Sequence, residues 1–302
     1  MESCQVRTDL ALEASEGVPG EQTKVSGVRV NEYKKQGDIL VTKVCIETKN
    51  AAKMLGKPMG CYVTIEAPTM AEPDEGYHRE VSKCLKKELC KLLPEKSGKK
   101  QSYLIVGLGN RAVTADALGP FVIDNLYINR HLIKEYGKAV LEGGDCNQVS
   151  SIEPGVMAKT GMETAEIIKG IIRETKPDCV IAIDALAARS IKRLSRTIQI
   201  CNTGIWPGSG VGNHRNALTE ETLGVPVIAI GVPMVVDAAT IVGDALDKLL
   251  SENKELETLR YGGHRQKFAE LNNMYMTGKD VDDIVKRVSY TVSEGLNMAL
   301  QG

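Results

Sequence analysis

The most informative segment for the fold is Cys179-Val-Ile-Ala-Ile-Asp-Ala-Leu-Ala-Ala-Arg-Ser190. Its continuous apolar run, residues 179–183, is typical of a strand buried on both faces, as in a parallel α/β sheet. Asp184 follows that run directly. Ligands bind at the carboxyl ends of strands in open parallel sheets, and a bare carboxylate in an apolar setting is costly unless it is paired, protonated or hydrogen-bonded. The pattern therefore favours a functional role for Asp184.

A second segment has the same layout: Tyr103-Leu-Ile-Val-Gly-Leu-Gly-Asn-Arg-Ala-Val-Thr-Ala-Asp-Ala-Leu-Gly-Pro120. Its apolar run again predicts a buried strand, and Asp116 follows after a short Gly-rich loop. If both strands belong to one parallel sheet, Asp116 and Asp184 lie at the same edge. Two carboxylates there are a candidate acid/base pair or metal pair. Asp116 also has a structural interpretation, as the N-cap of the helix that follows.

The turn Gly107-Leu-Gly-Asn110 invites a dinucleotide-binding interpretation. A full fingerprint needs a third small residue that opens a helix and an acidic residue about 20 positions further on. Here the helix is expected to begin only after a further loop, near Leu118. The turn is instead expected to let the backbone pass close to a ligand. A non-catalytic nucleotide-binding module remains an alternative, and thermal shifts with nucleotides would test it.

The rest of the chain sets the fold class. Strand-like patterns cover the N-terminal third, where Gly37-Asp38 predicts a hairpin, and from residue 103 strands alternate with helices. We therefore expect an α/β fold: a mostly parallel sheet with helices on both faces and additional N-terminal β-strands. The predicted strands are 25–33, 39–48, 61–67, 103–108, 179–183, 197–201 and 226–230; the predicted helices are 78–93, 118–128, 164–174, 236–250 and 281–300.

Composition narrows the function classes. The chain has 302 residues and a net charge of −1, so nothing indicates general affinity for nucleic acid or an anionic membrane. No apolar run approaches the ~18–20 residues of a membrane span, and the N-terminus has no secretory h-region. Eight cysteines without a Cys-x-x-Cys pair favour reduced thiols in a cytoplasm. The four histidines show no metal-ligand spacing, so we expect no metal and no cofactor.

Several segments together resemble the bacterial spore germination protease family, a group of atypical aspartic endopeptidases. The resemblance runs in matching order from the leader to Gly295-Leu-Asn297, and its main departure is a stretch around 251–278 that is shorter than the family pattern. The segments that carry it are Val6-Arg-Thr-Asp-Leu-Ala-Leu-Glu13, Val106-Gly-Leu-Gly-Asn110, Asp116-Ala-Leu-Gly-Pro120, Pro154-Gly-Val-Met157, Ala182-Ile-Asp-Ala-Leu-Ala-Ala-Arg-Ser190, Pro207-Gly-Ser-Gly-Val-Gly-Asn213 and Gly224-Val-Pro-Val-Ile-Ala-Ile-Gly231.

The resemblance implies an activity and a life cycle. Such enzymes degrade small acid-soluble spore proteins at germination, in the cytoplasm of the forespore and spore core. They are made as zymogens that remove their own propeptide, and they are typically homotetramers. Their two essential aspartates match Asp116 and Asp184. Their fold is related to hydrogenase-maturation endopeptidases. Applied here, residues 1–9 form the propeptide and 10–302 a single α/β peptidase domain.

The residues and the resemblance agree on the mechanism class. Two carboxylates a few ångströms apart cannot both ionise cheaply, so one would hold a proton while the other activates water. The runner-up hypothesis is a metal-dependent or metal-sensing endopeptidase of the hydrogenase-maturation type, which chelator sensitivity would separate. Small acid-soluble spore proteins are the expected substrates, with no direct binding to nucleic acid or membrane.

The leader carries the expected processing bond. Residues 1–22 are polar and are expected to be flexible, and the resemblance places self-cleavage between Asp9 and Leu10. Acidic residues on both sides of this bond, Asp9 and Glu13, suggest a cationic subsite. Arg189 and Arg193, with Lys192 and Arg196, are the candidates for that subsite, and a solvated basic helix face is the alternative interpretation.

Overall fold

The computed structural model describes residues 9–16, 26–94, 100–137, 146–207, 216–252, 271 and 274–301. The helices in these ranges are α1 (Ala11–Glu16), α2 (Lys49–Leu55), α3 (Glu75–Cys90), α4 (Leu118–Asp124), α5 (Arg130–Tyr136), α6 (Met157–Thr160), α7 (Thr164–Thr175), α8 (Glu220–Leu223), α9 (Ala238–Glu252) and α10 (Val281–Leu300). The strands are β1 (Val28–Lys34), β2 (Leu40–Ile46), β3 (Gly60–Glu66), β4 (Ser102–Gly107), β5 (Gln148–Ile152), β6 (Cys179–Ala188), β7 (Thr197–Cys201), β8 (Val227–Asp237) and β9 (Tyr275–Met276).

The described strands form one mixed sheet, in the order β1-β2-β3-β7-β8-β6-β4-β5, with β9 paired to β8. Only β5-β4-β6-β8 are parallel. All other pairings, including the predicted β1–β2 hairpin, are antiparallel. The prediction of a mostly parallel sheet is therefore wrong. The three N-terminal strands join through β7, which runs against β8, so the antiparallel half continues into the parallel half without a break.

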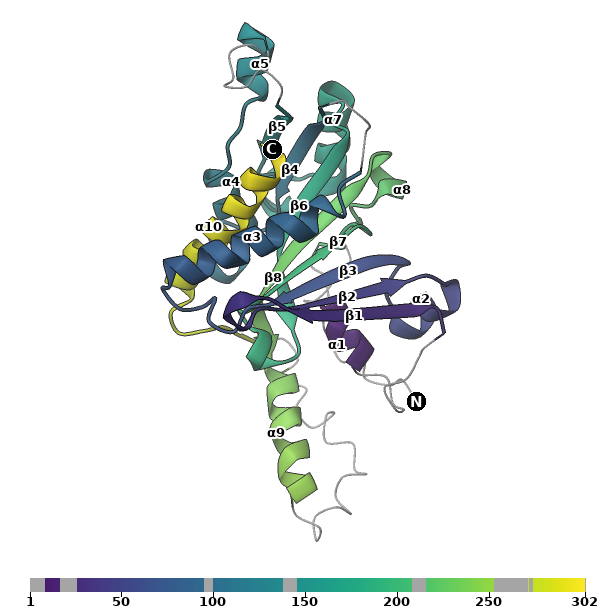
Figure 1. Cartoon of the computed structure of the whole chain (residues 1–302), viewed down its shortest axis with the longest axis vertical. Coiled ribbons are helices and arrows are strands. Elements are labelled where there is room, and N and C mark those ends of the chain that lie inside the picture. Colours follow the sequence, from purple (N-terminus) through teal and green to yellow (C-terminus); the bar gives the residue numbers. More distant parts are fainter. Residues whose placement is uncertain are drawn as a thin grey trace.

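Helices cover both faces of the sheet, as predicted. On one face α3, α4 and α10 pack on the first hydrophobic cluster, which includes Leu85, Leu118 and Leu296. Figure 1 shows α3 and α10 side by side across this face. On the other face a second cluster joins α1, α2, α7 and α8 to the strands. The alternation of residues along β6 explains the two clusters, because Ile181 and Ile183 point to the first and neighbouring residues to the second.

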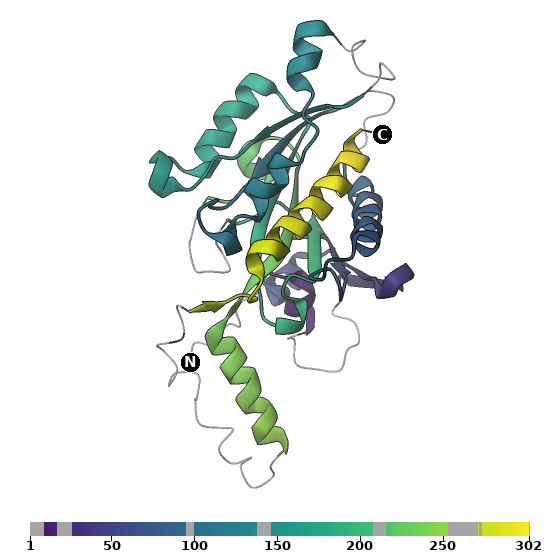
Figure 2. The ribbon, with the colours of Figure 1, turned by 90° about the vertical axis from the view of Figure 1, so that its left-hand side faces the viewer.

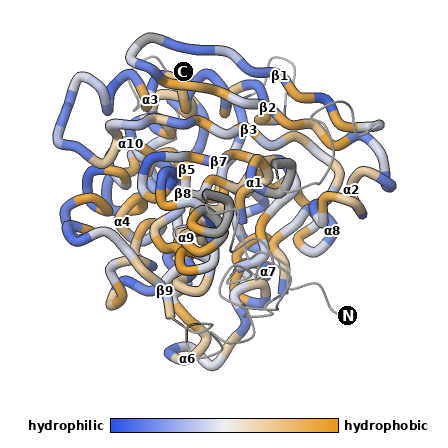
Figure 3. Tube along the Cα trace, turned by 90° about the horizontal axis from the view of Figure 1, so that it is seen from below, coloured by the Kyte–Doolittle hydropathy of each residue, from blue (hydrophilic) through white to orange (hydrophobic). Residues whose placement is uncertain are grey.

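The N-terminal segment corrects the expectation of a flexible leader, as far as its residues are described. Residues 11–16 form α1, which packs against α2 and β2. Leu10 is fully buried in the second cluster, and Ala11 and Leu12 are also buried. Hydrophobic segments gather near α1 and β7 when the molecule is seen along its long axis (Figure 3). Burial of the apolar residues 10–12 therefore holds this segment in place, although the polar residues around it in the sequence predicted a flexible leader.

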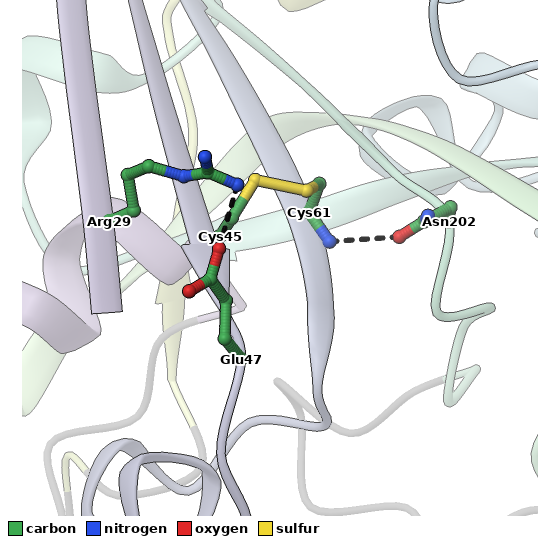
Figure 4. The surroundings of a disulfide bond; sticks show 5 residues. All are labelled: Arg29, Cys45, Glu47, Cys61 and Asn202. Carbon is green, nitrogen blue, oxygen red and sulfur yellow. Dashed lines mark hydrogen bonds and ion pairs between the residues drawn. A yellow bond between two sulfur atoms is a disulfide. The ribbon is translucent and has the colours of Figure 1, made fainter. Parts of the chain in front are cut away.

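Cys45 and Cys61 form a disulfide, so the expectation of reduced thiols is wrong for these two residues. Cys45 of β2 and Cys61 of β3 are directly opposed in the antiparallel register and are joined as a disulfide. Next to it the backbone N–H of Cys61 donates to Asn202, 2.9 Å away, as Figure 4 shows. The prediction that all thiols are reduced did not foresee this pairing, because it follows from strand register and not from spacing along the chain.

Helix α9 follows β8 directly and extends away from the sheet (Figures 1 and 2). Among the described residues, no helix is long and apolar enough to cross a membrane. Most of the stretch 251–278, in which the chain departs from the family pattern, lies outside the described residues, as does most of the Gly-rich loop 207–213.

Candidate active site

Asp184 lies inside a strand and not after one. β6 continues through Asp184 to Ala188, alongside β8, whereas its other neighbour β4 ends at Gly107 opposite Ile183. The sequence prediction of a strand ending at 183 is therefore wrong for β6, but Asp184 still lies just beyond the carboxyl end of β4. Its residue is 6% exposed, and its Oδ1 accepts a hydrogen bond from the backbone N–H of Ala185 at 3.0 Å. This contact partly compensates for the burial of the carboxylate.

Asp116 ends the 3-10 helix η2 (Thr114–Asp116), in the loop between β4 and α4. The N-cap position of α4 belongs to Ala117, so the interpretation of Asp116 as the helix N-cap is wrong. The Asp116 carbonyl accepts from the N–H of Asn110 at 3.0 Å. At Gly109, which has a φ of +114°, a Cβ would lie 2.0 Å from that carbonyl oxygen. The Gly-rich turn thus allows a close backbone approach, as its sequence suggested.

Backbone contacts tie the Asp116 loop to the residue before Asp184. The N–H of Leu108 donates to the carbonyl of Ile183 at 2.8 Å. A Cβ at Gly119 would lie 2.7 Å from this same Ile183 oxygen and 2.3 Å from the Leu108 oxygen. η2 also lies against β6 and β8. The fold therefore brings the backbone segments that carry the two predicted catalytic residues to one corner, at the end of β4.

Asp184 shares a cross-strand row with Gln199. Asp184 is opposite Gly231 of β8, and Gly231 is opposite Gln199 of β7. Residues opposite each other in a sheet point to the same face. This face is that of the second cluster, since Ala182 and Leu186 on either side of Asp184 both belong to it. Gly231, at the centre of this row, has no side chain to separate Asp184 from Gln199.

The bond predicted to be cleaved lies against that face. The N–H of Asp9 donates to the carbonyl of Ala187 at 3.1 Å, and the Asp9 carboxylate accepts from the Ala187 N–H at 2.9 Å. The Asp9 carbonyl accepts from Lys57 Nζ at 2.9 Å and from Gln199 Nε2 at 3.2 Å. Two residues further, the N–H of Ala11 donates to Gln199 Oε1 at 2.6 Å. Both sides of the Asp9–Leu10 bond are therefore held, by the backbone of β6, by Gln199 of β7 and by Lys57, which follows α2.

Glu13 lies in a site made largely by the end of β6 and the turn after it. Its carboxylate accepts from the backbone N–H groups of Arg189 at 2.8 Å and Ser190 at 3.0 Å. The Arg193 guanidinium lies 3.4 Å from the same carboxylate and also bonds Glu66. The side chain of Arg189 instead pairs with Asp244 of α9. Of the two predicted subsite residues, Arg193 thus contacts Glu13 through its side chain, and Arg189 through its backbone.

Lys57 is a site residue that sequence reasoning missed. Helix α2 is capped by Gly56 in the left-handed conformation, and the N–H groups of Gly56 and Lys57 both donate to the Ala52 carbonyl. This cap turns Lys57 toward Asp9. Leu55-Gly-Lys-Pro58 is a helix-stop signal that would have located the turn. It would not have shown which segment the ammonium reaches, because Asp9 is 48 residues away.

Burial of the ammonium group lowers the pKa of Lys57 below its ordinary value. The acidic groups that oppose this effect are Asp9, Glu13 and Cys201.

In the described ranges no group of three or more His, Cys, Asp or Glu side chains is placed to hold a metal ion.

Comparison with known proteins identifies the family. A family model described as germination protease matches residues 6–259. The germination protease of Caldanaerobacter subterraneus subsp. tengcongensis is 46% identical, over 98% of this chain and 94% of the relative. That of Clostridium tetani is 45% identical, over 98% and 95%. That of Bacillus cytotoxicus is 50% identical, over 81% and 67%. This chain therefore belongs to the germination protease family, and it is a peptidase.

Proposed function

We propose that this chain is an aspartic-type endopeptidase that is made as a zymogen, removes residues 1–9 by cleaving Asp9–Leu10, and then begins the degradation of small acid-soluble spore proteins at germination. The observation that carries the proposal is the position of the Asp9–Leu10 bond, which is held against the same face of the sheet to which Asp184 points. A chain that cuts itself must present its own bond to its own catalytic groups.

The proposed chemistry uses Asp116 and Asp184 as a coupled pair. One carboxylate takes a proton from water as the water oxygen attacks the Asp9 carbonyl carbon, while the other, protonated, gives its proton to the leaving nitrogen of Leu10. The near-complete burial of Asp184 and the contact between the Asp116 loop and Ile183 support this assignment. Arg193 and the end of β6 are the proposed subsite for an acidic residue four positions after the cut.

Family membership supports action inside the forespore and the spore core, where the small acid-soluble proteins are found. A homotetramer is the proposed assembly, and light scattering on the purified chain measures it directly.

Intact-mass spectrometry of the purified chain tests the proposed function. Samples are followed during incubation at mildly acidic pH, with and without a chelator. We expect a single product that begins at Leu10, whose first-order rate does not depend on protein concentration. Asp184→Asn should stay full-length under the same conditions.

A mature N-terminus other than Leu10, or equal processing of Asp184→Asn without added active enzyme, would refute self-cleavage at this bond. Processing that stops with the chelator and returns with an added divalent metal would identify the metal-dependent alternative.

A further inference from the structure

The carbonyl of Asp9 accepts hydrogen bonds from two side chains. Lys57 Nζ is 2.9 Å from the carbonyl oxygen and Gln199 Nε2 is 3.2 Å from it. Asp9 is already anchored on both its N–H and its carboxylate by Ala187. Two residues after Asp9, the N–H of Ala11 donates to the same Gln199 side chain. The two donors thus converge on the carbonyl that the proposed reaction attacks.

Both donors are set in place by the surrounding structure. Gln199 is 8% exposed and sits in the row that contains Asp184, with its amide oxygen committed to the Ala11 N–H. That commitment fixes the amide so that its NH2 group faces the Asp9 oxygen. Lys57 is half-buried and is directed by the left-handed cap at Gly56. A charged donor and an amide donor aimed at one carbonyl in a water-poor setting are the arrangement that stabilises a developing oxyanion.

We propose that Lys57 and Gln199 are catalytic residues that bind the carbonyl oxygen of the scissile bond and stabilise the negative charge it acquires. The assignment rests on the proposed function, because it takes Asp9–Leu10 as the bond that is cut. In this assignment Asp116 and Asp184 carry out only the proton transfers. The negative charge on the oxygen is stabilised by Lys57, a cationic group from another part of the chain, together with Gln199.

The oxygen of a water molecule bonds to the Asp9 carbonyl carbon, one water proton passes to a carboxylate, and the C=O π electrons move onto the oxygen held by Lys57 and Gln199. When those electrons return to re-form C=O, the bond to the Leu10 nitrogen breaks and its electron pair takes a proton from the second carboxyl group. The products are a carboxyl group on Asp9 and an amine on Leu10, and Lys57 keeps its proton throughout.

The competing interpretation is that Lys57 and Gln199 only dock the N-terminal segment. Two substitutions separate the roles. Lys57→Met removes the ammonium and keeps an unbranched chain. Lys53→Met, at an exposed position on α2 just before Lys57, is its matched control. Gln199→Glu keeps an oxygen acceptor for the Ala11 N–H but loses the donor to the Asp9 carbonyl.

The experiment measures the first-order rate at which each full-length chain yields a product that begins at Leu10. We expect Lys57→Met and Gln199→Glu each to be slower than wild type by about 100-fold or more, the loss typical of an oxyanion donor, and Lys53→Met to be unchanged. Lys57→Arg keeps a cation at this position and should lose less of the rate than Lys57→Met.

Docking is measured separately in chains that cannot cut themselves. Hydrogen exchange of the Ala11 and Ala187 amides is compared between Asp184→Asn and Asp184→Asn combined with Lys57→Met. Slow processing with both amides still protected supports the catalytic assignment. Slow processing with protection lost overturns it in favour of docking, and rates within about threefold of wild type also overturn it.

The same measurements distinguish failure of the proposed function from failure of the assignment of Lys57 and Gln199. If wild type never yields a product at Leu10, self-cleavage at this bond is refuted and the assignment of Lys57 and Gln199 falls with it. If wild type cleaves there and Lys57→Met cleaves equally well, only the assignment of these two residues is refuted.

Discussion

Asp116 and Asp184 occupy unlike surroundings although similar sequences carry them. Asp184 lies within a ten-residue strand, nearly buried, with a backbone N–H on its carboxylate. Asp116 is half-buried at the end of a 3-10 turn in a loop. Unlike surroundings are what a pair of carboxyl groups needs if one is to act as a base and the other as an acid.

Removing either carboxylate should stop self-processing and leave the fold intact. Asp116→Asn and Asp184→Asn each keep the shape of the side chain and remove a proton-transfer group, so we expect the rate of appearance of the Leu10 product to fall by about 10³-fold or more. Far-UV circular dichroism and urea titration report the fold. Asp282→Asn, at an exposed aspartate on α10, is the control and should process at the wild-type rate. Near wild-type rates in either active-site variant would remove that residue from the mechanism.

At the scale of elements, the site depends on how closely α4 approaches the strands. A Cβ at Gly107 would lie 2.5 Å from the Gly119 carbonyl oxygen, and a Cβ at Gly119 would meet the backbone of Leu108 and Ile183. Because these contacts are backbone atoms, they cannot move aside without distorting the strands and the helix. The two glycines thus let the start of α4 sit directly on β4 and β6, and this contact sets where Asp116 lies relative to Asp184.

Gly119→Ala should therefore damage both stability and activity. We expect a loss of about 1–3 kcal/mol in the free energy of unfolding, as for overpacking of a tight contact, together with slower self-processing. The matched control is Gly170→Ala in the interior of α7, where a Cβ would meet no atom within 4 Å. It should stabilise the chain by about 0.5–1 kcal/mol, because alanine favours the helix. Urea unfolding measures both, and a Gly119→Ala chain as stable and active as wild type would contradict the close-contact account.

At the scale of the whole molecule, helices on both faces bury thiol and phenol groups as well as aliphatic side chains. Burial raises the pKa of Cys84 to about 11 and the pKa values of Cys179 and Tyr103 to about 12. In the unfolded chain these groups ionise near 9 for cysteine and 10 for tyrosine. The folded state therefore holds these protons more tightly than the unfolded state does.

Stability should consequently fall at alkaline pH. The contribution of Cys84 is complete below pH 9 and is lost as the pH rises toward about 11. Each group ionised only in the unfolded chain lowers the free energy of unfolding by up to about 1.4 kcal/mol per pH unit. Urea unfolding from pH 8 to pH 11 measures the slope. Cys84→Ala should make it shallower, whereas Cys90→Ala, at an exposed position on the same helix, should not. Equal slopes in all three chains would contradict this assignment.

The sequence located many of the strands and helices and predicted which residues carry the chemistry. The apolar runs and period-3.6 stripes located β4, β7, α3, α7 and α10 closely, because these patterns reflect burial of each element on its own. It also determined the family, since motifs in a fixed order are local information. The choice of Asp116 and Asp184 as the catalytic pair came from the sequence too and stays a prediction.

How these elements meet depends on contacts between distant parts of the chain. The direction of β7 between β3 and β8 makes the sheet mixed, and no property of residues 197–201 alone specifies it. The extension of β6 through Asp184 depends on pairing with β8, and the Cys45–Cys61 bond depends on register. The approach of Lys57 and Gln199 to the Asp9 carbonyl joins three segments far apart in the chain. Such contacts follow from packing of the whole chain, which spacing and periodicity along a sequence do not encode.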